Sequence, residues 1–205
     1  METRPLEATE EALNSYAQIC ADYCKKASLI LQEQGEMSPI TEMAREVLIY
    51  ARHLAQFDHT MNGAYVAARD MADCLYDHPR LKLQLWEVED EVLDIIEAQS
   101  GHDLNIHDDL QQMMRTYRFN IQAADEGRLK DIIPIGHLNN DPIEWTQAYE
   151  DVIDEADHDA YSHLTDCPRG MGFCFVYWHE KEQALARRGI EWRSPRMMNP
   201  GVIFD

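Results

Sequence analysis

Basic residues are scarce in this chain: 18 lysines and arginines stand against 38 aspartates and glutamates, for a formal net charge of −20. A surface of that sign repels nucleic-acid phosphates, so direct nucleic-acid binding is not expected. The chain also lacks an apolar run long enough to cross a bilayer, so no membrane partner is expected. Its first residues lack the basic, apolar and small stretches of a signal peptide. The five cysteines, an odd number, favour free thiols and a cytoplasmic location.

Several motifs that define enzyme classes are missing. The sequence has no phosphate-binding glycine loop, nucleophile elbow, dinucleotide fingerprint or zinc cysteine set. It also has no internal repeat and no low-complexity segment. No cofactor is therefore predicted, and no motif identifies a family.

Helical periodicity is the main feature that the sequence does have. Between positions 38 and 77, apolar or small residues recur in alternating steps of three and four, which is typical of one helix face. Ser38 is a good N-cap and Pro39 suits the first helical position. The spacing predicts one continuous helix that passes through Asn62-Gly63. Asp58 is the single polar residue on its apolar face.

The same periodicity extends to other parts of the chain. Further helices are predicted over residues 7–34, 79–99, 108–125, 141–164 and 170–188. Pro134 interrupts residues 128–140, which we expect to form a loop packed against the core. The stretch after Gly189 has no helical period, but its apolar side chains predict that it is held against the body. The predicted fold is mainly α: a single-domain bundle of five or six helices around the long helix, with an irregular C-terminal tail.

Charge divides the chain unevenly. Of the charged residues, 12 basic and 33 acidic ones precede Thr165, which leaves 6 basic and 5 acidic ones in the remainder. We therefore predict an acidic helical body over residues 1–164. Residues 165–205 are predicted to form a C-terminal helix and tail that pack on this body within one domain.

Aromatic and arginine side chains are concentrated in that C-terminal section. This composition is typical of packing between a helix and the body, and also of protein interfaces. It occurs in single-stranded nucleic-acid sites as well, which the net charge disfavours. The candidate interaction residues are Arg169, Phe173, Tyr177, Trp178, Arg188, Trp192 and Arg193.

An acidic run at residues 87–94 indicates a second kind of site. Glu87 and Asp90 share a polar helix face. The run resembles the carboxylate helices that hold magnesium in all-helical nucleotide pyrophosphatases. Such a site requires a facing carboxylate helix, for which Glu150 and Asp154 are the candidates. These four residues support an alternative hypothesis, a metal-dependent all-α hydrolase of phosphate esters or nucleotides.

Other pairs of histidine and carboxylate have metal-like spacing but weaker support. Glu155 and His158 have the Glu-x-x-His spacing of di-iron bundles, but the period places His158 away from the apolar face. His102-Asp103 and His107-Asp108 are His-Asp pairs of the kind that helical metal-dependent phosphohydrolases use to hold a metal. An aspartate at such a helix start is equally explained as a cap.

Asp58 and His163 both fall on apolar helix faces. Because buried charges are seldom left alone, we predict that they form a hydrogen-bonded buried pair. This pair would either fix the register of the helices or belong to a small pocket.

Taken together, these features favour a non-enzymatic function. The chain is typical of an acidic helical adaptor or regulator that binds a protein partner. In one form of this hypothesis, an acidic face of the chain mimics nucleic acid and binds in the groove of a basic partner. The metal-dependent hydrolase is the first alternative. A structural subunit of a larger assembly, which includes a homo-oligomer, is the second.

Overall fold

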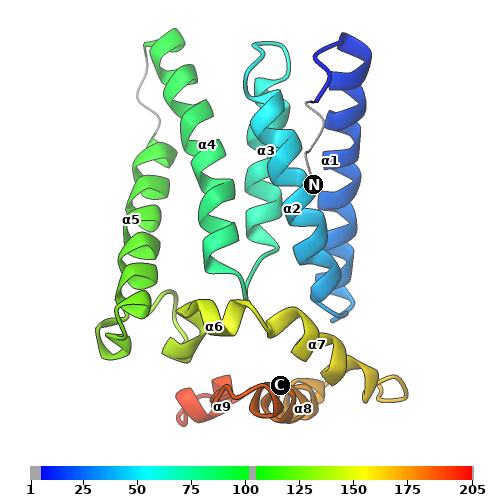
Figure 1. Ribbon diagram of the computed structural model, residues 1–205, viewed down its shortest axis with the longest axis vertical. Helices are drawn as coiled ribbons and strands as arrows, with labels where there is room; N and C mark the ends of the chain where they lie inside the picture. Colours follow the sequence, from blue (N-terminus) through cyan, green and yellow to red (C-terminus); the bar gives the residue numbers. More distant parts are fainter. Residues whose placement is uncertain (1–5, 102–104, 205) are drawn as a thin grey trace. The chain divides into compact units, whose positions relative to one another are not determined.

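The computed structural model describes residues 6–101 and 105–204, and within them the chain forms helices and no strands (Figure 1). The prediction of a mainly α bundle is therefore confirmed. Among the described residues, no helix combines the length and the apolar character needed to cross a membrane.

The chain divides into two compact units. Unit 1 contains the chain up to Leu29, together with Glu42–Tyr76 and Arg80–Arg115. Unit 2 contains Ile30–Thr41, Asp77–Pro79 and the chain from Thr116 onward.

Unit 1 is built from long helices with antiparallel neighbours (Figure 1). Five helices contribute residues to it: α1 Glu10–Gln32, α2 Ser38–Leu54, α3 Met61–Asp73, α4 Pro79–Ser100 and α5 Asn105–Asp125. Tyr16 of α1 stacks on Tyr50 of α2, with ring centroids 4.9 Å apart. Cys24 of α1 donates a hydrogen bond from Sγ to the carbonyl of Ala67 in α3, at 3.5 Å. The periodic apolar faces therefore pack on one another as the sequence predicts.

The prediction of one continuous helix over residues 38–77 is wrong. Residues 55–60 form a turn that separates α2 from α3. Thr60 stabilises this turn, because its hydroxyl donates to the carbonyl oxygens of Leu54 and Phe57 at 2.7 and 3.2 Å. The same two carbonyls also accept backbone hydrogen bonds within the turn, from the N–H groups of Phe57 and of Thr60 and Met61, respectively. Asn62-Gly63 lies inside α3 and causes no break.

Unit 2 contains the shorter helices. They are the 3-10 helices η1 Leu129–Asp131 and η2 Pro142–Trp145, and the α-helices α6 Gln147–Glu150, α7 Ile153–Ser162, α8 Phe173–Arg187 and α9 Pro195–Met198. The single helix predicted over residues 141–164 is therefore divided into three pieces. Thr146 has an extended backbone, with φ −82° and ψ 147°, and its side chain accepts a hydrogen bond from the Tyr149 amide as the N-cap of α6. A Thr that caps a new helix interrupts the previous one.

The predicted loop over residues 128–140 is present apart from η1. Asn120 of α5 holds it: its amide donates to the carbonyl of Ile133 at 2.9 Å and accepts from the Ile133 backbone N–H at 2.8 Å. Both hydrogen bonds join residues of unit 2.

The core of unit 2 forms where α7 and α8 pack together. Its buried side chains are Tyr149, Ile153, Ala156, Ala184, Leu185, Ile190 and Trp192. Gly189, with φ +81°, ends α8 in the left-handed region that favours glycine. Ile190 and Trp192 follow this turn and lie in the core, so the chain after α8 packs against the rest of unit 2. The expected irregular tail contains one short helix, α9.

Candidate functional site

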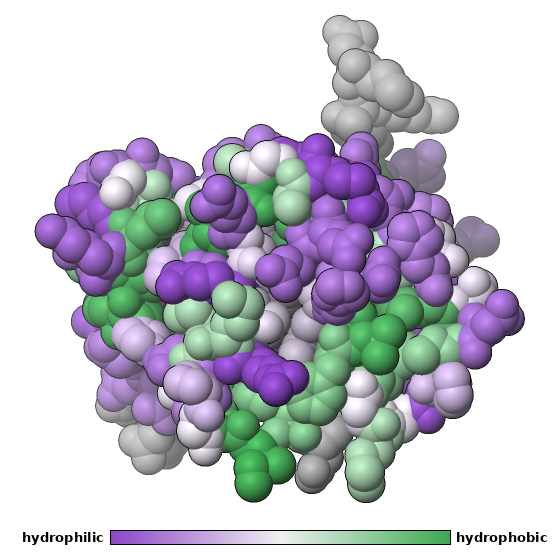
Figure 2. Space-filling model, turned by 90° about the horizontal axis from the view of Figure 1, so that it is seen from below, coloured by the Kyte–Doolittle hydropathy of each residue, from purple (hydrophilic) through white to green (hydrophobic). Residues whose placement is uncertain are grey.

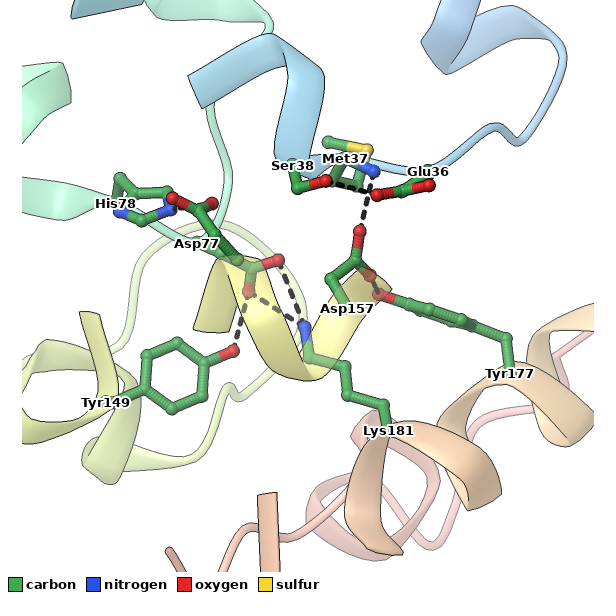
Figure 3. Close-up of polar contacts among 10 residues, drawn as sticks. Glu36, Met37, Ser38, Asp77, His78, Tyr149, Asp157, Tyr177 and Lys181 are labelled. Carbon is green, nitrogen blue, oxygen red and sulfur yellow. Dashed lines mark hydrogen bonds and ion pairs between the residues drawn. The ribbon is translucent and has the colours of Figure 1, made fainter. Parts of the chain in front are cut away.

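An ion pair is buried in the core of unit 2 (Figure 3). Lys181 of α8 is only 4% exposed. Its Nζ lies 3.0 Å from each carboxylate oxygen of Asp77, which belongs to the connection between α3 and α4. The Tyr149 hydroxyl donates a further hydrogen bond to Asp77, at 2.7 Å. One carboxylate therefore joins α6, α8 and the chain segment before α4.

Both members of this pair are charged. Burial by itself raises the pKa of Asp77, but Lys181 and Tyr149 outweigh burial and hold the pKa below its ordinary value. Burial likewise lowers the pKa of Lys181, but the neighbouring carboxylates, Asp77 above all, raise it overall. The rings of Tyr149, Tyr177 and Trp192 surround the ammonium, with centroids 5.8, 5.8 and 5.2 Å away.

A second buried carboxylate lies close to the ion pair in Figure 3. Asp157 of α7 accepts a hydrogen bond from the Tyr177 hydroxyl at 2.5 Å and another from the Met37 backbone N–H at 2.6 Å. Burial raises the pKa of Asp157 above its ordinary value, although Lys181 and the two donors act in the opposite direction. Asp157 thus joins α7, α8 and the residues that precede α2, all within unit 2.

Two more acidic residues complete the polar core of unit 2. Glu144 accepts a hydrogen bond from Trp192 Nε1 at 2.7 Å, and burial raises the pKa of its carboxyl to about 7. Asp141 caps η2 and receives Arg193 on both oxygens, from Nε and Nη2 at 3.0 Å each. Across the described residues, every buried side-chain nitrogen or oxygen has a hydrogen-bond partner. The buried polar groups of this core, as far as the structure describes them, are therefore satisfied by one another.

Unit 1 contains a more open cluster on α4 and α5. His107 Nε2 lies 2.8 Å from Asp90 and 3.6 Å from Asp94, while its Nδ1 lies 2.9 Å from Glu97. Burial lowers the pKa of His107, but the hydrogen bonds to Glu97 and Asp90 raise it above the ordinary value overall. Asp90, Asp94 and His107 have a residue combination that can hold a metal ion.

A third feature of the structure is an apolar surface on unit 2. We define it by four exposed side chains, Val176, Met197, Val202 and Ile203, and three partly buried rings, Phe175, Trp178 and Phe204. Trp178 meets Phe175 and Phe204 edge to face, at 5.6 and 5.1 Å between centroids. Figure 2 shows several groups of hydrophobic side chains among hydrophilic ones on the face that it draws. The surface therefore joins α8 to the C-terminal segment.

Several predicted interaction residues lie in the interior. Phe173 and Trp192 are both 4% exposed, so their assignment to an interaction surface is wrong. The Tyr177 hydroxyl is engaged by Asp157. Trp178 is the one aromatic residue of the set that contributes to the apolar surface.

The predicted arginines form contacts within unit 2. Arg188 donates to Asp159 at 2.8 Å and Arg193 pairs with Asp141. The guanidinium of Arg169 lies over the ring of Phe173, 4.4 Å from its centroid. These contacts match the packing alternative that the sequence left open.

The predicted buried pair of Asp58 and His163 is wrong. Asp58 lies in the turn between α2 and α3, and its side chain is exposed. His163 follows α7, is exposed as well, and pairs through Nδ1 with Glu180 at 2.8 Å. The prediction failed because it extended one helical period across the turns at residues 55–60 and 151–152, where the period stops.

The four residues predicted to hold magnesium belong to different units. Glu87 and Asp90 lie in unit 1, whereas Glu150 and Asp154 lie in unit 2, so their joint site stays a prediction. Asp90 contacts His107, and Asp154 lies 2.8 Å from Nε2 of the buried His78.

The weaker histidine pairs have mixed outcomes. His158 is exposed, as its helical position predicts, and contacts Glu36 at 2.8 Å. In the pair His107-Asp108, Asp108 is exposed, and the carboxylates that contact His107 come from α4 instead. The pair His102-Asp103 lies outside the described residues.

Sequence reasoning missed the residues of the polar core, although a signal was present. Lys181 occupies the same helix face as Phe173, Tyr177 and Leu185, since these positions are separated by four or eight residues. A lysine within an apolar stripe indicates a buried cation that requires a buried anion. The position of Asp77, 104 residues away, has no counterpart in any local pattern.

Comparisons of this chain with protein families, with curated proteins and with solved structures found no match.

Proposed function

We propose that the protein is a non-enzymatic adaptor or regulator that binds a basic protein partner, with the apolar surface of unit 2 as the contact. The observation that carries this proposal is the exposure of large apolar side chains that come from α8, α9 and the C-terminal segment together. Ile203 is 91% exposed and Met197 is 57% exposed. The ring of Trp178 contacts those of Phe175 and Phe204 and so links α8 to the C-terminal segment. Single exposed apolar residues are common, whereas an apolar surface larger than one residue is typical of an interaction site.

The charge of the chain supports the choice of partner. A formal charge of −20 repels a second copy of the same chain, and it attracts a partner of positive net charge over long distances. The apolar surface then stabilises the complex after the encounter, because burial of apolar area is favourable and is not screened by ions as charge attraction is. Charge complementarity contributes to the rate of association more than to the final affinity.

The polar core of unit 2 supports a binding function over a catalytic one. Lys181 and Asp157 are buried and Asp77 is mostly buried, and each is engaged by another residue of the core. Their arrangement holds α7 and α8 together and so gives the apolar surface a rigid base. The metal-dependent hydrolase and the structural subunit remain alternative hypotheses.

A pair of matched variants tests this proposal. Ile203→Asp changes the apolar surface, and Ile49→Asp changes an exposed isoleucine of α2 in unit 1 by the same charge. A photo-crosslinking residue at position 203 identifies the bound protein, which is then purified for affinity measurements. We expect Ile203→Asp to weaken binding at least tenfold and Ile49→Asp to change it less than twofold. We also expect the association rate to fall as salt is raised.

Two results would overturn the proposal. Equal affinities of the two variants for the purified partner would show that the apolar surface is not the contact. A dimer of the protein alone in sedimentation experiments, lost in Ile203→Asp, would identify a second copy as the occupant. Both variants add one negative charge, so a difference in affinity between them is due to the loss of the apolar contact at position 203.

A further inference from the structure

We propose that Asp90, Asp94 and His107 form a binding site for one first-row transition-metal dication in unit 1. Each residue offers one ligand atom, and these atoms lie within 4.8 Å of one another. Ligand atoms around a tetrahedral zinc lie about 3.3 Å apart, so a small rotation of the aspartate side chains is sufficient to close the site. Asp94, whose side chain is 66% exposed, is free to make that rotation.

Helix geometry brings the ligands together. Asp90 and Asp94 are four residues apart on α4, so they occupy one face of the helix. His107 lies in the first turn of α5 and directs its Nε2 at both carboxylates, at 2.8 and 3.6 Å. The cluster therefore combines an imidazole and two carboxylates from two helices of the same unit.

Glu97 fixes the orientation of the imidazole. Its Oε2 lies 2.9 Å from His107 Nδ1 and accepts a hydrogen bond from that N–H. Nε2 faces the carboxylates of Asp90 and Asp94 and, without a metal, donates a hydrogen bond to Asp90. A bound ion would take the place of that Nε2 proton, which is released on binding. Histidine ligands of metal ions are held in this way by a carboxylate on the other nitrogen. Glu97 is therefore a positioning residue of the site.

The burial of these groups suits an ion that enters from solvent. His107 is only 5% exposed, so the imidazole is held rigidly among its neighbours. The exposed side chain of Asp94 provides the path of entry that a metal site requires.

The ligand types select the metal. One imidazole and two carboxylates favour zinc, cobalt, manganese or ferrous iron over calcium and magnesium, which prefer oxygen ligands alone. Gln111 lies one turn after His107, and its side-chain amide is 3.1 Å from Nε2. The oxygen and nitrogen of an amide exchange places by rotation, so Gln111 is able to supply a fourth ligand.

The test uses the full chain, freed of metal by a chelator and titrated with Zn²⁺, Co²⁺ and Mg²⁺ in a calorimeter. We expect one equivalent of Zn²⁺ or Co²⁺ to bind at least tenfold more tightly than Mg²⁺. Asp94→Asn is expected to weaken Zn²⁺ binding at least tenfold. The matched control is Glu91→Gln, an exposed residue on α4 that loses the same charge, and it is expected to change the affinity less than twofold.

Two further measurements make the result decisive. Glu97→Gln is expected to weaken Zn²⁺ binding by about 10- to 100-fold while one ion still binds, as loss of an outer-shell carboxylate does elsewhere. Co²⁺ is expected to broaden the imidazole NMR signals of His107 before those of the other histidines. Absence of stoichiometric binding, or equal losses in Asp94→Asn and Glu91→Gln, would show that the cluster is only an ion pair between α4 and α5. Because the apolar surface belongs to unit 2, failure of the metal site leaves the proposed partner binding intact.

Discussion

The ammonium of Lys181 lies 3.0 Å from both carboxylate oxygens of Asp77, although the two residues are 104 positions apart in the chain. A contact of this kind closes a long loop, so it connects the segment before α4 to α8 within unit 2. The surrounding rings exclude water, and exclusion of water strengthens the attraction while it makes loss of either partner costly.

Replacement of Lys181 by methionine therefore destabilises the protein. The substitution keeps much of the side-chain volume but leaves Asp77 as an uncompensated buried charge. We expect the free energy of unfolding to fall by about 3–5 kcal/mol, measured by urea denaturation.

A double variant provides the control. Lys181→Met combined with Asp77→Asn removes both charges. The side-chain carbonyl oxygen of the asparagine can still accept the hydrogen bond from the Tyr149 hydroxyl. It is expected to be less destabilised than Lys181→Met alone. A single variant within about 1 kcal/mol of the wild type would contradict a charged, desolvated pair.

The Tyr149 hydroxyl offers a milder test of the same core. Tyr149→Phe removes the 2.7 Å donor of Asp77 and leaves the ring in place. Loss of one hydrogen bond to a buried carboxylate costs about 1–3 kcal/mol. Tyr76→Phe is the control, since Tyr76 is exposed, and its free energy of unfolding is expected to stay within about 0.5 kcal/mol of the wild type. Equal effects of the two changes in urea denaturation would refute the role of the Tyr149 hydroxyl.

Local signals in the sequence predicted most helices well. α4 begins at Pro79 as predicted, because proline at the first helical position needs no N–H donor. α8 spans Phe173–Arg187, within three residues of the prediction at each end. Helix ends of this kind depend on caps and breakers that lie next to them in the chain.

The breaks between helices and the clusters of polar side chains depend instead on residues that are distant in the sequence or that have weak preferences. Thr60 stabilises the turn after Leu54 through a hydrogen bond to the Leu54 carbonyl. Threonine also occurs inside helices, so it does not signal a turn, and the apolar period predicts a continuous helix. The cluster around His107 could be predicted in part, because Asp90 was assigned to a polar face of its helix. The role of Glu97 depends on how α4 meets α5, which a period along one helix does not specify.

The cysteines differ in their expected reactivity. Burial raises the pKa of Cys20 and of Cys24 to about 12, and it raises that of Cys74 as well. A thiol must ionise and meet the reagent to react, so these three are protected in the folded state. Cys167 and Cys174 are partly exposed.

A thiol titration at pH 8 measures this difference. We expect Ellman's reagent to modify at most two thiols of the native protein rapidly and all five cysteines after unfolding in guanidinium. In the double variant Cys167→Ser, Cys174→Ser the fast reaction should disappear. Rapid modification of more than two thiols in the native state would contradict the packing of α1 against α3.

Glu89 makes the stability of unit 1 depend on pH. This residue of α4 is buried, and burial raises the pKa of its carboxyl from 4.5 to about 7, with Arg69 opposing the shift and Asp73 and Asp70 adding to it. The folded state therefore keeps a proton on Glu89 at pH values where the unfolded chain has lost it.

A raised carboxyl pKa has a defined sign in the stability. Below pH 4.5 both states are protonated and Glu89 has no effect; between pH 4.5 and 7 the folded state binds more protons, so the free energy of unfolding falls as pH rises. The full loss of stability, reached above pH 7, is at most about 3 kcal/mol.

Glu89→Gln keeps the shape of the side chain and removes its ionisation. We therefore expect the free energy of unfolding to rise by about 1–3 kcal/mol at pH 8.5 and to change by less than about 0.5 kcal/mol at pH 4. Urea denaturation of both proteins across this range measures the difference, and an equal offset at both pH values would show that the effect of Gln is not electrostatic.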